Sequence, residues 1–326
     1  MSEKFLKVED LVVEYRTGGK VVQAVNNVSF ELERGKTLGL VGETGAGKTT
    51  IAKTILRVLP DAQAKVKSGK VILDGVDLLS LSEAAMRKVR GGQVTMVFQD
   101  PMTALNPIMK VGEQIAEVIR KHQTREDKTA REMAEDMLAM VGIPRERYGE
   151  YPHQFSGGMK QRVVIAMALA CNPHLLLADE PTTALDVTIQ AQVLDMMDDL
   201  KKKYNTAMIL ITHDLGVVGR MCDNVAVIYA GEVLEYGSKE EIFLPPQHPY
   251  TIGLFGAIPD LSVDTRRLAN IEGLPPDPTD LPTGCCFNPR CPHATDKCRT
   301  IKFPLTEVRP GHFCSCPYCE AAEKED

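Results

Sequence analysis

One segment has the spacing of a phosphate-binding loop. Residues 42–49 read GETGAGKT and fit the pattern G-x-x-x-x-G-K-[ST] at every fixed position. Glycines let successive backbone N–H groups turn toward one anion, and a following helix adds its positive end. Lys48 would place its charge at the β- and γ-phosphates of a nucleotide, and Thr49 would offer a hydroxyl to Mg²⁺. The predicted phosphate-binding residues are Gly42, Glu43, Thr44, Gly45, Ala46, Gly47, Lys48, Thr49 and Thr50.

A second candidate site is a pair of acidic residues at the end of an apolar run. Asp179 and Glu180 directly follow the apolar residues 175–178. An acid at the tip of a buried strand is costly unless something compensates its charge, and Mg²⁺ held near the phosphate loop would do so. We expect Asp179 to bind Mg²⁺ through water and Glu180 to polarise an attacking water. The alternative is that one of these acids only caps the following helix.

The sequence predicts an α/β scaffold that would hold these motifs. Through the first 240 residues or so, short β-branched runs alternate with longer helical patterns, which is typical of parallel βαβ units. Polar residues follow the predicted strands, at the edge where open α/β sheets bind ligands. The strand–loop–helix order argues against an ordinary glycine-rich turn at residues 42–49. The predicted strands are Thr37–Gly42, Val94–Phe98, His174–Asp179 and Ala207–Thr212, and a helix is predicted over Thr50–Leu59.

Composition shifts suggest two parts of unequal size. Val111–Val141 has a helical pattern with mixed charge and predicts a helical insertion, while the Pro-rich run Leu244–Tyr250 marks a boundary. We therefore predict a nucleotide-binding domain over residues 1–245, with a helical subdomain at about residues 105–170. A C-terminal extension is predicted over residues 246–326.

Composition and charge exclude some classes of protein. Of the 326 residues, 44% are apolar and 25% charged, the ordinary balance of a globular protein with a sizeable core. The net charge is −6, so no sequence-wide basic field would attract nucleic acid. Apolar stretches such as Val163–Ala170 are far shorter than the roughly 18–20 residues that cross a bilayer. The N-terminus lacks the apolar core of a signal peptide. We expect a cytoplasmic protein that reaches a membrane only through partners.

The nine cysteines are unevenly placed. Cys171 and Cys222 stand alone in apolar, helix-like contexts. The others crowd into the C-terminal part of the chain. In a reducing cytoplasm such a cluster suggests a metal or iron–sulfur site rather than disulfides. The clustered residues are Cys285, Cys286, Cys291, Cys298, Cys314, Cys316 and Cys319.

Residues 155–162 read FSGGMKQR and closely resemble the signature sequence of ABC-transporter ATPases, whose usual form is LSGGQ. Ser156, Gly157 and Gly158 would form the start of another helix with a hydroxyl and bare backbone N–H groups, which makes a second anion cradle. One chain does not need two cradles for one γ-phosphate. The resemblance implies a head-to-tail dimer in which this cradle caps ATP held by the other subunit.

Further matches follow in the order that the ABC family has. Gln99 resembles the glutamine that touches Mg²⁺ and senses the membrane partner, and Asp186 in residues 184–186 resembles the loop that links two ATP sites. His213 resembles the histidine that contacts the γ-phosphate, and Tyr15 resembles the aromatic residue that stacks on adenine. Alone, His213 and Tyr15 would be interpreted as structural residues. The catalytic residues that the resemblance implies are Lys48, Glu180 and His213, and the Mg²⁺ ligands are Thr49, Gln99 and Asp179.

Three segments narrow the resemblance to one subfamily, the ATPases of dipeptide, oligopeptide and nickel importers. They are Val97–Pro107, Asp179–Gln190 and Gln247–Thr251. The match is to the first (D-type) of the two ATPase subunits, with the dipeptide type favoured. It implies a P-loop NTPase core with a mixed or parallel sheet, an antiparallel β subdomain, a helical subdomain and a small Cys-rich appendage.

The subfamily resemblance implies an ATP hydrolase that drives import of peptides or nickel. Its partners would be a second related ATPase subunit, two transmembrane permease subunits and, indirectly, an extracellular binding protein; a homodimer is the alternative for the isolated chain. The chain would be a peripheral protein on the cytoplasmic face of the membrane. Other readings are a non-transport ABC protein and a regulatory ATP-binding module. Phe155 and Met159 depart from the usual Leu and Gln of the signature.

The subfamily pattern also implies a ligand set for a [4Fe–4S] cluster: Cys285, Cys291, Cys298 and Cys316. Four thiolates suit either such a cluster or Zn²⁺, and spacing without tight C-x-x-C pairs among these four favours the cluster. Cys286, Cys314 and Cys319 leave the assignment open, above all between Cys314 and Cys316. Unliganded thiols are the remaining alternative.

Overall fold

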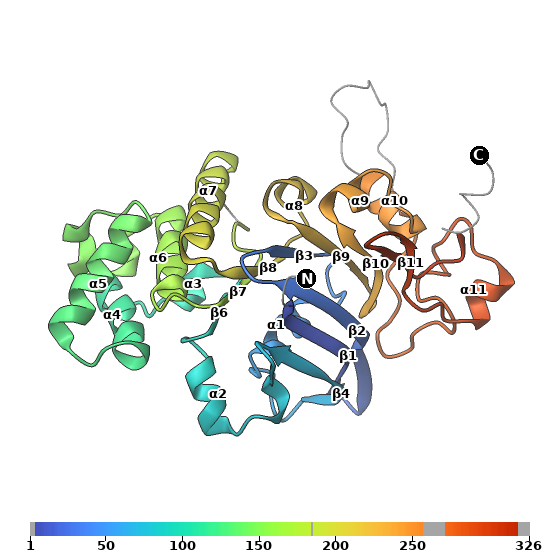
Figure 1. The fold of residues 1–326 in the computed structure, drawn as a ribbon, viewed down its shortest axis with the longest axis horizontal. Coiled ribbons are helices and arrows are strands. Elements are labelled where there is room, and N and C mark those ends of the chain that lie inside the picture. The colour runs from blue at the N-terminus through green and yellow to red at the C-terminus, as the bar shows by residue number, and fades with distance from the viewer. Residues whose placement is uncertain (1–3, 184, 257–270, 319–326) are drawn as a thin grey trace. The chain divides into compact units, whose positions relative to one another are not determined.

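The computed structural model describes residues 4–183, 185–256 and 271–318 (Figure 1). The described chain forms two compact units. Unit 1 contains residues 33–36 and 80–210, and unit 2 contains residues 4–32, 37–79 and the described residues from 211 onward. Each unit is described separately below.

Unit 2 contains an antiparallel sheet with the order β2-β1-β4-β5. Leu6 pairs with Leu73 and Tyr15 with Ala64 along the β1–β4 ladder. Alternate residues of these strands are buried, such as Phe5 and Val13, because one face of the sheet covers the core. The sheet confirms the antiparallel β subdomain that the resemblance implied. Its strands are β1 (Lys4–Thr17), β2 (Lys20–Glu33), β4 (Ala64–Leu73) and β5 (Val76–Asp77).

The second group of strands in unit 2 runs β11-β12-β10-β9-β3. β3 pairs with β9 in parallel, while the other neighbours pair antiparallel, so this sheet is mixed. All five residues of β3 are buried, as expected for a strand covered on both faces. The strands are β3 (Thr37–Val41), β9 (Asn224–Tyr229), β10 (Glu232–Ser238), β11 (Thr306–Arg309) and β12 (His312–Cys314).

Short helices connect these strands of unit 2. The first begins at Lys48, directly after the phosphate loop, rather than at the predicted Thr50. It ends at Ile55, earlier than predicted, since Arg57 adopts a left-handed backbone with φ 51° that a continuing helix cannot contain. The helices are α1 (Lys48–Ile55), α8 (Leu215–Met221), α9 (Lys239–Phe243), α10 (Pro249–Gly256) and α11 (Asp296–Thr300).

Unit 1 contains three strands in the order β8-β7-β6, with β6 and β7 parallel. They are β6 (Val94–Val97), β7 (Leu175–Asp179) and β8 (Ala207–Ile211), each within one residue of its predicted bounds. β7 and β8 are built almost entirely from buried apolar residues, which is the composition of strands covered by helices on both faces, while β6 combines buried Val94 and Val97 with the buried Thr95 and the half-buried Met96.

Helices make up the rest of unit 1 (Figure 1). The predicted helical segment over residues 111–141 is two helices, because the chain leaves the helix at Gln123 and a new helix begins after Glu126. These two helices pack against each other, and α6 packs against α7 and β6. The helices are α2 (Glu83–Val89), α3 (Pro101–Ala104), α4 (Val111–His122), α5 (Asp127–Met140), α6 (Gly157–Leu169) and α7 (Val187–Tyr204).

The sequence analysis made predictions about membrane-spanning helices and about a boundary near residue 245. No helix among the described residues is both long enough and apolar enough to span a bilayer. The boundary predicted between residues 245 and 246 stays a prediction. Beyond it, β12 pairs with β10, so residues from the C-terminal part of the chain extend a sheet that begins before the boundary.

Candidate functional site

The phosphate loop of unit 2 curls around the ammonium group of Lys48. Its Nζ donates to the carbonyl oxygens of Gly42 at 2.7 Å and Glu43 at 2.8 Å, and Lys48 is only 7% exposed. Gly47 has a φ of 99°, and a Cβ there would lie 2.2 Å from the carbonyl oxygen of Ala24. No other residue fits at this position without moving the backbone. The loop therefore has the tight, glycine-dependent turn that a phosphate cradle requires.

Two predicted nucleotide-binding residues in this unit contact each other. Tyr15 is half-buried on β1, and its hydroxyl lies 3.4 Å from Oγ1 of Thr50 on α1. The aromatic residue that was predicted to stack on adenine thus lies beside the helix that follows the phosphate loop. His213 is exposed between β8 and α8, and the next residue, Asp214, caps α8 by accepting from the backbone N–H of Gly216 at 2.9 Å.

In unit 1, the acidic pair stands at the end of β7 as predicted. Asp179 is the last residue of the strand and is 4% exposed. Glu180 adopts a left-handed backbone with φ 47°, a conformation that costs a non-glycine residue about 1 kcal/mol or more. Strain of this kind persists where a side chain must point in one direction.

Two side chains hold the carboxylate of Glu180. Gln99 donates from Nε2 to Oε2 at 2.8 Å, and Thr183 donates from Oγ1 to the same oxygen at 2.9 Å. The structure thus brings together two residues that the sequence assigned to the site, Gln99 and Glu180. Thr183 was not assigned a role, although its place three residues after Glu180, across a tight turn, was a usable signal.

The signature segment forms the start of α6 in unit 1. Ser156 is its N-cap, and its Oγ accepts from the backbone N–H of Met159 at 3.4 Å. Ser156 and Gly157 are exposed, while a Cβ at Gly158 would lie 2.5 Å from Cγ2 of Ile189. The structure thus places a hydroxyl and bare backbone at an exposed helix start, and anion binding there stays a prediction.

Arg147 contacts both residues that depart from the usual signature. Its guanidinium carbon lies 4.4 Å from the centroid of the Phe155 ring, and its Nη1 lies 3.4 Å from Sδ of Met159. Phe155 is 5% exposed. The aromatic ring and the thioether therefore pack around one arginine, outside the hydroxyl and glycines that would contact a phosphate.

Asp186 is the N-cap of α7, and its Oδ1 accepts from the backbone N–H of Ile189 at 3.0 Å. The side chain is exposed. Ala184, in the same predicted loop, lies outside the described residues. The predicted link between two ATP sites involves a second chain and stays a prediction.

The four predicted cluster ligands of unit 2 line one cavity of about 260 Å³. Its wall combines thiols with aromatic rings. Cys286 has another environment: it is 2% exposed, and its Sγ lies 3.8 Å from the carbonyl oxygen of Tyr229. Cys314 is fully buried on β12 and is not part of the cavity wall, and Cys319 lies outside the described residues. The cavity residues used below are Cys285, Cys291, Cys298 and Cys316.

Burial favours the protonated thiol at two of these cysteines. It raises the pKa of Cys285 to about 11 and also raises the pKa of Cys291. A metal would have to displace these protons, because the thiolate is the ligand. Within the described ranges, no three His, Cys, Asp or Glu side chains are grouped closely enough to hold a single metal ion. The thiols surround a space instead of converging on one point.

A buried polar network supports the segment that precedes this cavity. Glu235 on β10 is fully buried and accepts from the backbone N–H groups of Gln247 at 2.7 Å and His248 at 2.9 Å. Nε2 of His312 on β12 lies 2.7 Å from the same carboxylate. His248 in turn accepts at Nδ1 from the backbone N–H of Tyr250. The predicted subfamily segment 247–251 is therefore held to the sheet by hydrogen bonds to the Glu235 carboxyl group.

Two family models match the chain. One, described as ABC transporter, matches residues 25–183, and the other, described as oligopeptide/dipeptide transporter, C-terminal region, matches residues 234–298. The first range contains the phosphate loop, the acidic pair and the signature segment. The second contains the polar network apart from His312, and three of the four cavity cysteines.

Curated relatives match nearly the whole chain. The dipeptide transport ATP-binding protein DppD of Bacillus subtilis is 48% identical over 317 residues, which are 96% of this chain and 94% of the relative. The oligopeptide transport ATP-binding protein OppD of Haemophilus influenzae is 49% identical over 313 residues, 95% of this chain and 96% of the relative. A solved dimeric structure of the ATP-binding cassette MJ0796 with ADP and phosphate has a TM-score of 0.64 and 27% identity, and covers 72% of this chain and 98% of that one.

Proposed function

The chain belongs to the family of ABC-transporter ATP-binding proteins, and on that premise we propose that it is the ATPase subunit that drives import of dipeptides or oligopeptides. Members of this family hydrolyse ATP. The observation that carries the proposal is the pairing of two matches: relatives named for dipeptide and oligopeptide transport cover almost the whole chain, and the peptide-transporter C-terminal region follows the ATPase motifs. Nickel is the alternative cargo.

In unit 2, the phosphate loop and its neighbours would bind the nucleotide. Lys48 would turn its ammonium from the carbonyl oxygens of the loop to the β- and γ-phosphates, and Thr50 and Tyr15 would lie beside the phosphates and the adenine. His213 would contact the γ-phosphate. Two contacts support this proposal. Lys48 donates to carbonyl oxygens of the phosphate loop, and Tyr15 contacts Thr50 on the helix that follows the loop.

In unit 1, Glu180 would polarise the attacking water. Gln99 and Thr183 both donate to its Oε2, so the carboxylate has one preferred orientation. Asp179, Gln99 and Thr49 offer the oxygen ligands that Mg²⁺ prefers. When bound, Mg²⁺ would neutralise charge on the phosphate oxygens.

Ser156, Gly157 and Gly158 would cap the triphosphate held by a second, related ATPase subunit. The exposed helix start at Ser156 supports this, as does the dimeric state of the similar cassette. Two permease subunits would form the channel, and an extracellular binding protein would deliver the peptide. The complex would place this chain on the cytoplasmic face of the membrane as a peripheral subunit, without a nucleic-acid partner.

The C-terminal cysteines would hold a [4Fe–4S] cluster through Cys285, Cys291, Cys298 and Cys316. Zn²⁺ held by the same four thiolates is the alternative. A cavity of about 260 Å³ with four thiols in its wall suits a multinuclear group. The cluster would tie together a segment with little core of its own.

Reconstitution tests the proposed transport directly. The chain, the related ATPase subunit and the two permeases are placed in liposomes with the binding protein outside and ATP inside. We expect ATP-dependent accumulation of a labelled dipeptide or oligopeptide and no accumulation of nickel. Nickel uptake without peptide uptake would show that nickel is the cargo. Peptide uptake that is independent of ATP would contradict the proposed role of this chain.

A further inference from the structure

We propose that Arg290 and Tyr250 are positioning residues for the phosphate loop, which they hold by Glu43. Arg290 and Tyr250 belong to the C-terminal part of unit 2, whereas Glu43 is the second residue of the loop. One residue holds the side chain of Glu43 and the other its backbone. This arrangement makes the affinity for ATP depend on a segment far away in the sequence.

The side-chain contact is a bidentate ion pair. Arg290 donates from Nη1 to Oε2 of Glu43 at 2.9 Å and from Nη2 to Oε1 at 3.1 Å. The Arg290 side chain is 5% exposed and that of Glu43 is 25% exposed, so water screens this pair less than a surface pair. Two parallel hydrogen bonds fix the carboxylate plane as well as its distance.

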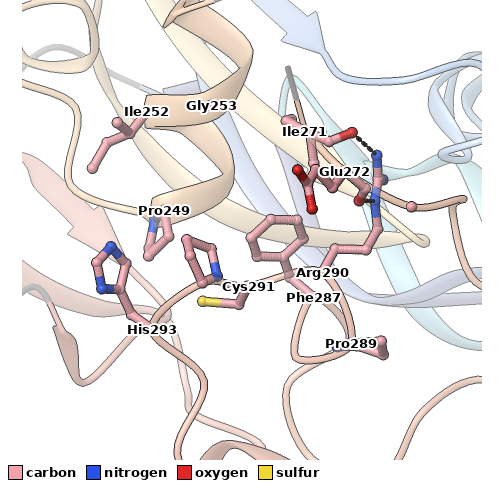
Figure 2. A pocket seen from close by; sticks show the side chains of 12 residues that line it. Pro249, Ile252, Gly253, Ile271, Glu272, Phe287, Pro289, Arg290, Cys291 and His293 are labelled. Carbon is pink, nitrogen blue, oxygen red and sulfur yellow. Dashed lines mark hydrogen bonds between the residues drawn. The ribbon is translucent and has the colours of Figure 1, made fainter. Parts of the chain in front are cut away.

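Arg290 is itself held from three sides. Its Nε donates to the carbonyl oxygen of Glu272 at 2.9 Å, its Nη2 to that of Ile271 at 3.3 Å, and its Nη1 to the Tyr229 hydroxyl at 3.2 Å. Figure 2 shows the guanidinium next to residues 271–272, at the side of a cavity of about 760 Å³. A guanidinium with this many fixed acceptors cannot follow a moving carboxylate, so it anchors Glu43 rather than being carried by it.

Tyr250 holds the backbone of the same loop residue. Its hydroxyl accepts from the backbone N–H of Glu43 at 3.0 Å, and the side chain is fully buried. Its ring centroid lies 4.7 Å from that of Tyr229 and 5.4 Å from that of Phe287. The carbonyl oxygen of Glu43 accepts from Lys48 at 2.8 Å, so both backbone polar groups of Glu43 have partners.

These contacts have a direct consequence for ATP. The carboxylate of Glu43 carries the same sign of charge as a triphosphate bound at the loop, and it would weaken phosphate binding if it were unpaired. Arg290 neutralises it, and Tyr250 keeps the adjacent carbonyl oxygen in reach of Lys48. Arg290 and Tyr250 therefore act on nucleotide binding through Glu43, without touching the nucleotide.

The test measures ATP affinity in the intact chain, with the ATPase reaction as a second readout. Arg290→Ala should raise the Kd and the KM for ATP about tenfold, the factor that about 1.4 kcal/mol produces, and change kcat less than about twofold. Adding Glu43→Gln to Arg290→Ala should restore most of the affinity, because the unpaired charge is gone. Tyr250→Phe should raise the Kd with kcat unchanged.

A matched control separates this role from general stability. Arg299→Ala removes an exposed ion pair of 3.8 Å with Asp296 on α11 in the same unit, and should leave the Kd for ATP unchanged. Arg290→Lys should keep the charge but lose the bidentate hydrogen bonding to Glu43, and should give an intermediate Kd for ATP. Two results would overturn the proposal: a parental Kd in Arg290→Ala, or a double variant no better than Arg290→Ala alone. If Arg290→Ala fails to fold, the Arg290→Lys and Tyr250→Phe values decide, and parental affinity in both rejects it.

Discussion

The side-chain amide of Gln99 donates to the carboxylate of Glu180 at 2.8 Å, which joins the segments that follow β6 and β7 in unit 1. One of these residues was predicted to sense the membrane partner and the other to activate water. A direct hydrogen bond lets a shift of the Gln99 segment change the orientation of the carboxylate. A movement of the membrane partner could then affect ATP hydrolysis through this single side-chain contact.

Replacing the proposed base separates binding from chemistry. Glu180→Gln keeps the size of the side chain but removes its ability to accept a proton, so kcat should fall by about 10²–10⁴ while ATP still binds. Equilibrium binding of labelled ATP and steady-state phosphate release measure the two quantities. A variant that hydrolyses ATP at the parental rate would show that another group activates the water.

The contact of Thr183 with Glu180 predicts a smaller effect of the same kind. Thr183→Ala removes one of the two donors to Oε2, so kcat should fall about threefold to tenfold with the KM for ATP unchanged. Thr183→Ser keeps the hydroxyl and is the matched control, and it should restore most of kcat. Equal losses in the Ala and Ser variants would mean that the hydroxyl has no part in orienting Glu180.

Local patterns were sufficient to predict the loop and the strands around it. The spacing of residues 42–49 and the apolar run before Asp179 each specify a local backbone, and the structure places β3, β6, β7 and β8 within one residue of their predicted bounds. The segment predicted to be helical over residues 111–141 is helical, and it is divided into two helices between Gln123 and Glu126. No glycine or proline marks that break.

Contacts between distant segments could not be predicted in this way. Arg290 and Glu43 are 247 residues apart, and nothing in either local segment indicates that they pair. The same holds for Arg147 and its contacts with Phe155 and Met159. Such partners depend on tertiary packing, which a single sequence read by local spacing does not contain.

Two glycines of unit 2 both have a positive φ, but only Gly47 also lies in close contact with another segment, so substituting each tests the two effects separately. At Gly47, an alanine would have to adopt a positive φ, and its Cβ would lie 2.2 Å from the carbonyl oxygen of Ala24. Gly47→Ala should therefore displace the loop and abolish measurable ATP binding. At Gly18, φ is 59° and nothing lies within 4 Å of a Cβ. Gly18→Ala should therefore cost only about 1–2 kcal/mol of stability and leave ATP binding unchanged. Thermal unfolding and nucleotide titration measure both variants, and retained ATP affinity in Gly47→Ala would contradict the cradle.

The cysteine cavity predicts which thiols a metal group needs. After anaerobic reconstitution with iron and sulfide, the parent should bind about four iron and four sulfide per chain, as one [4Fe–4S] cluster requires. Cys291→Ser and Cys316→Ser each remove a thiol from the cavity wall and should lose the cluster. Cys286→Ser is the matched control, since this thiol lies against Tyr229 outside the cavity wall, and it should keep the full iron content. One zinc and no iron per chain would replace the cluster by a mononuclear site, while iron loss in Cys286→Ser equal to that in Cys291→Ser would reject the assigned ligand set.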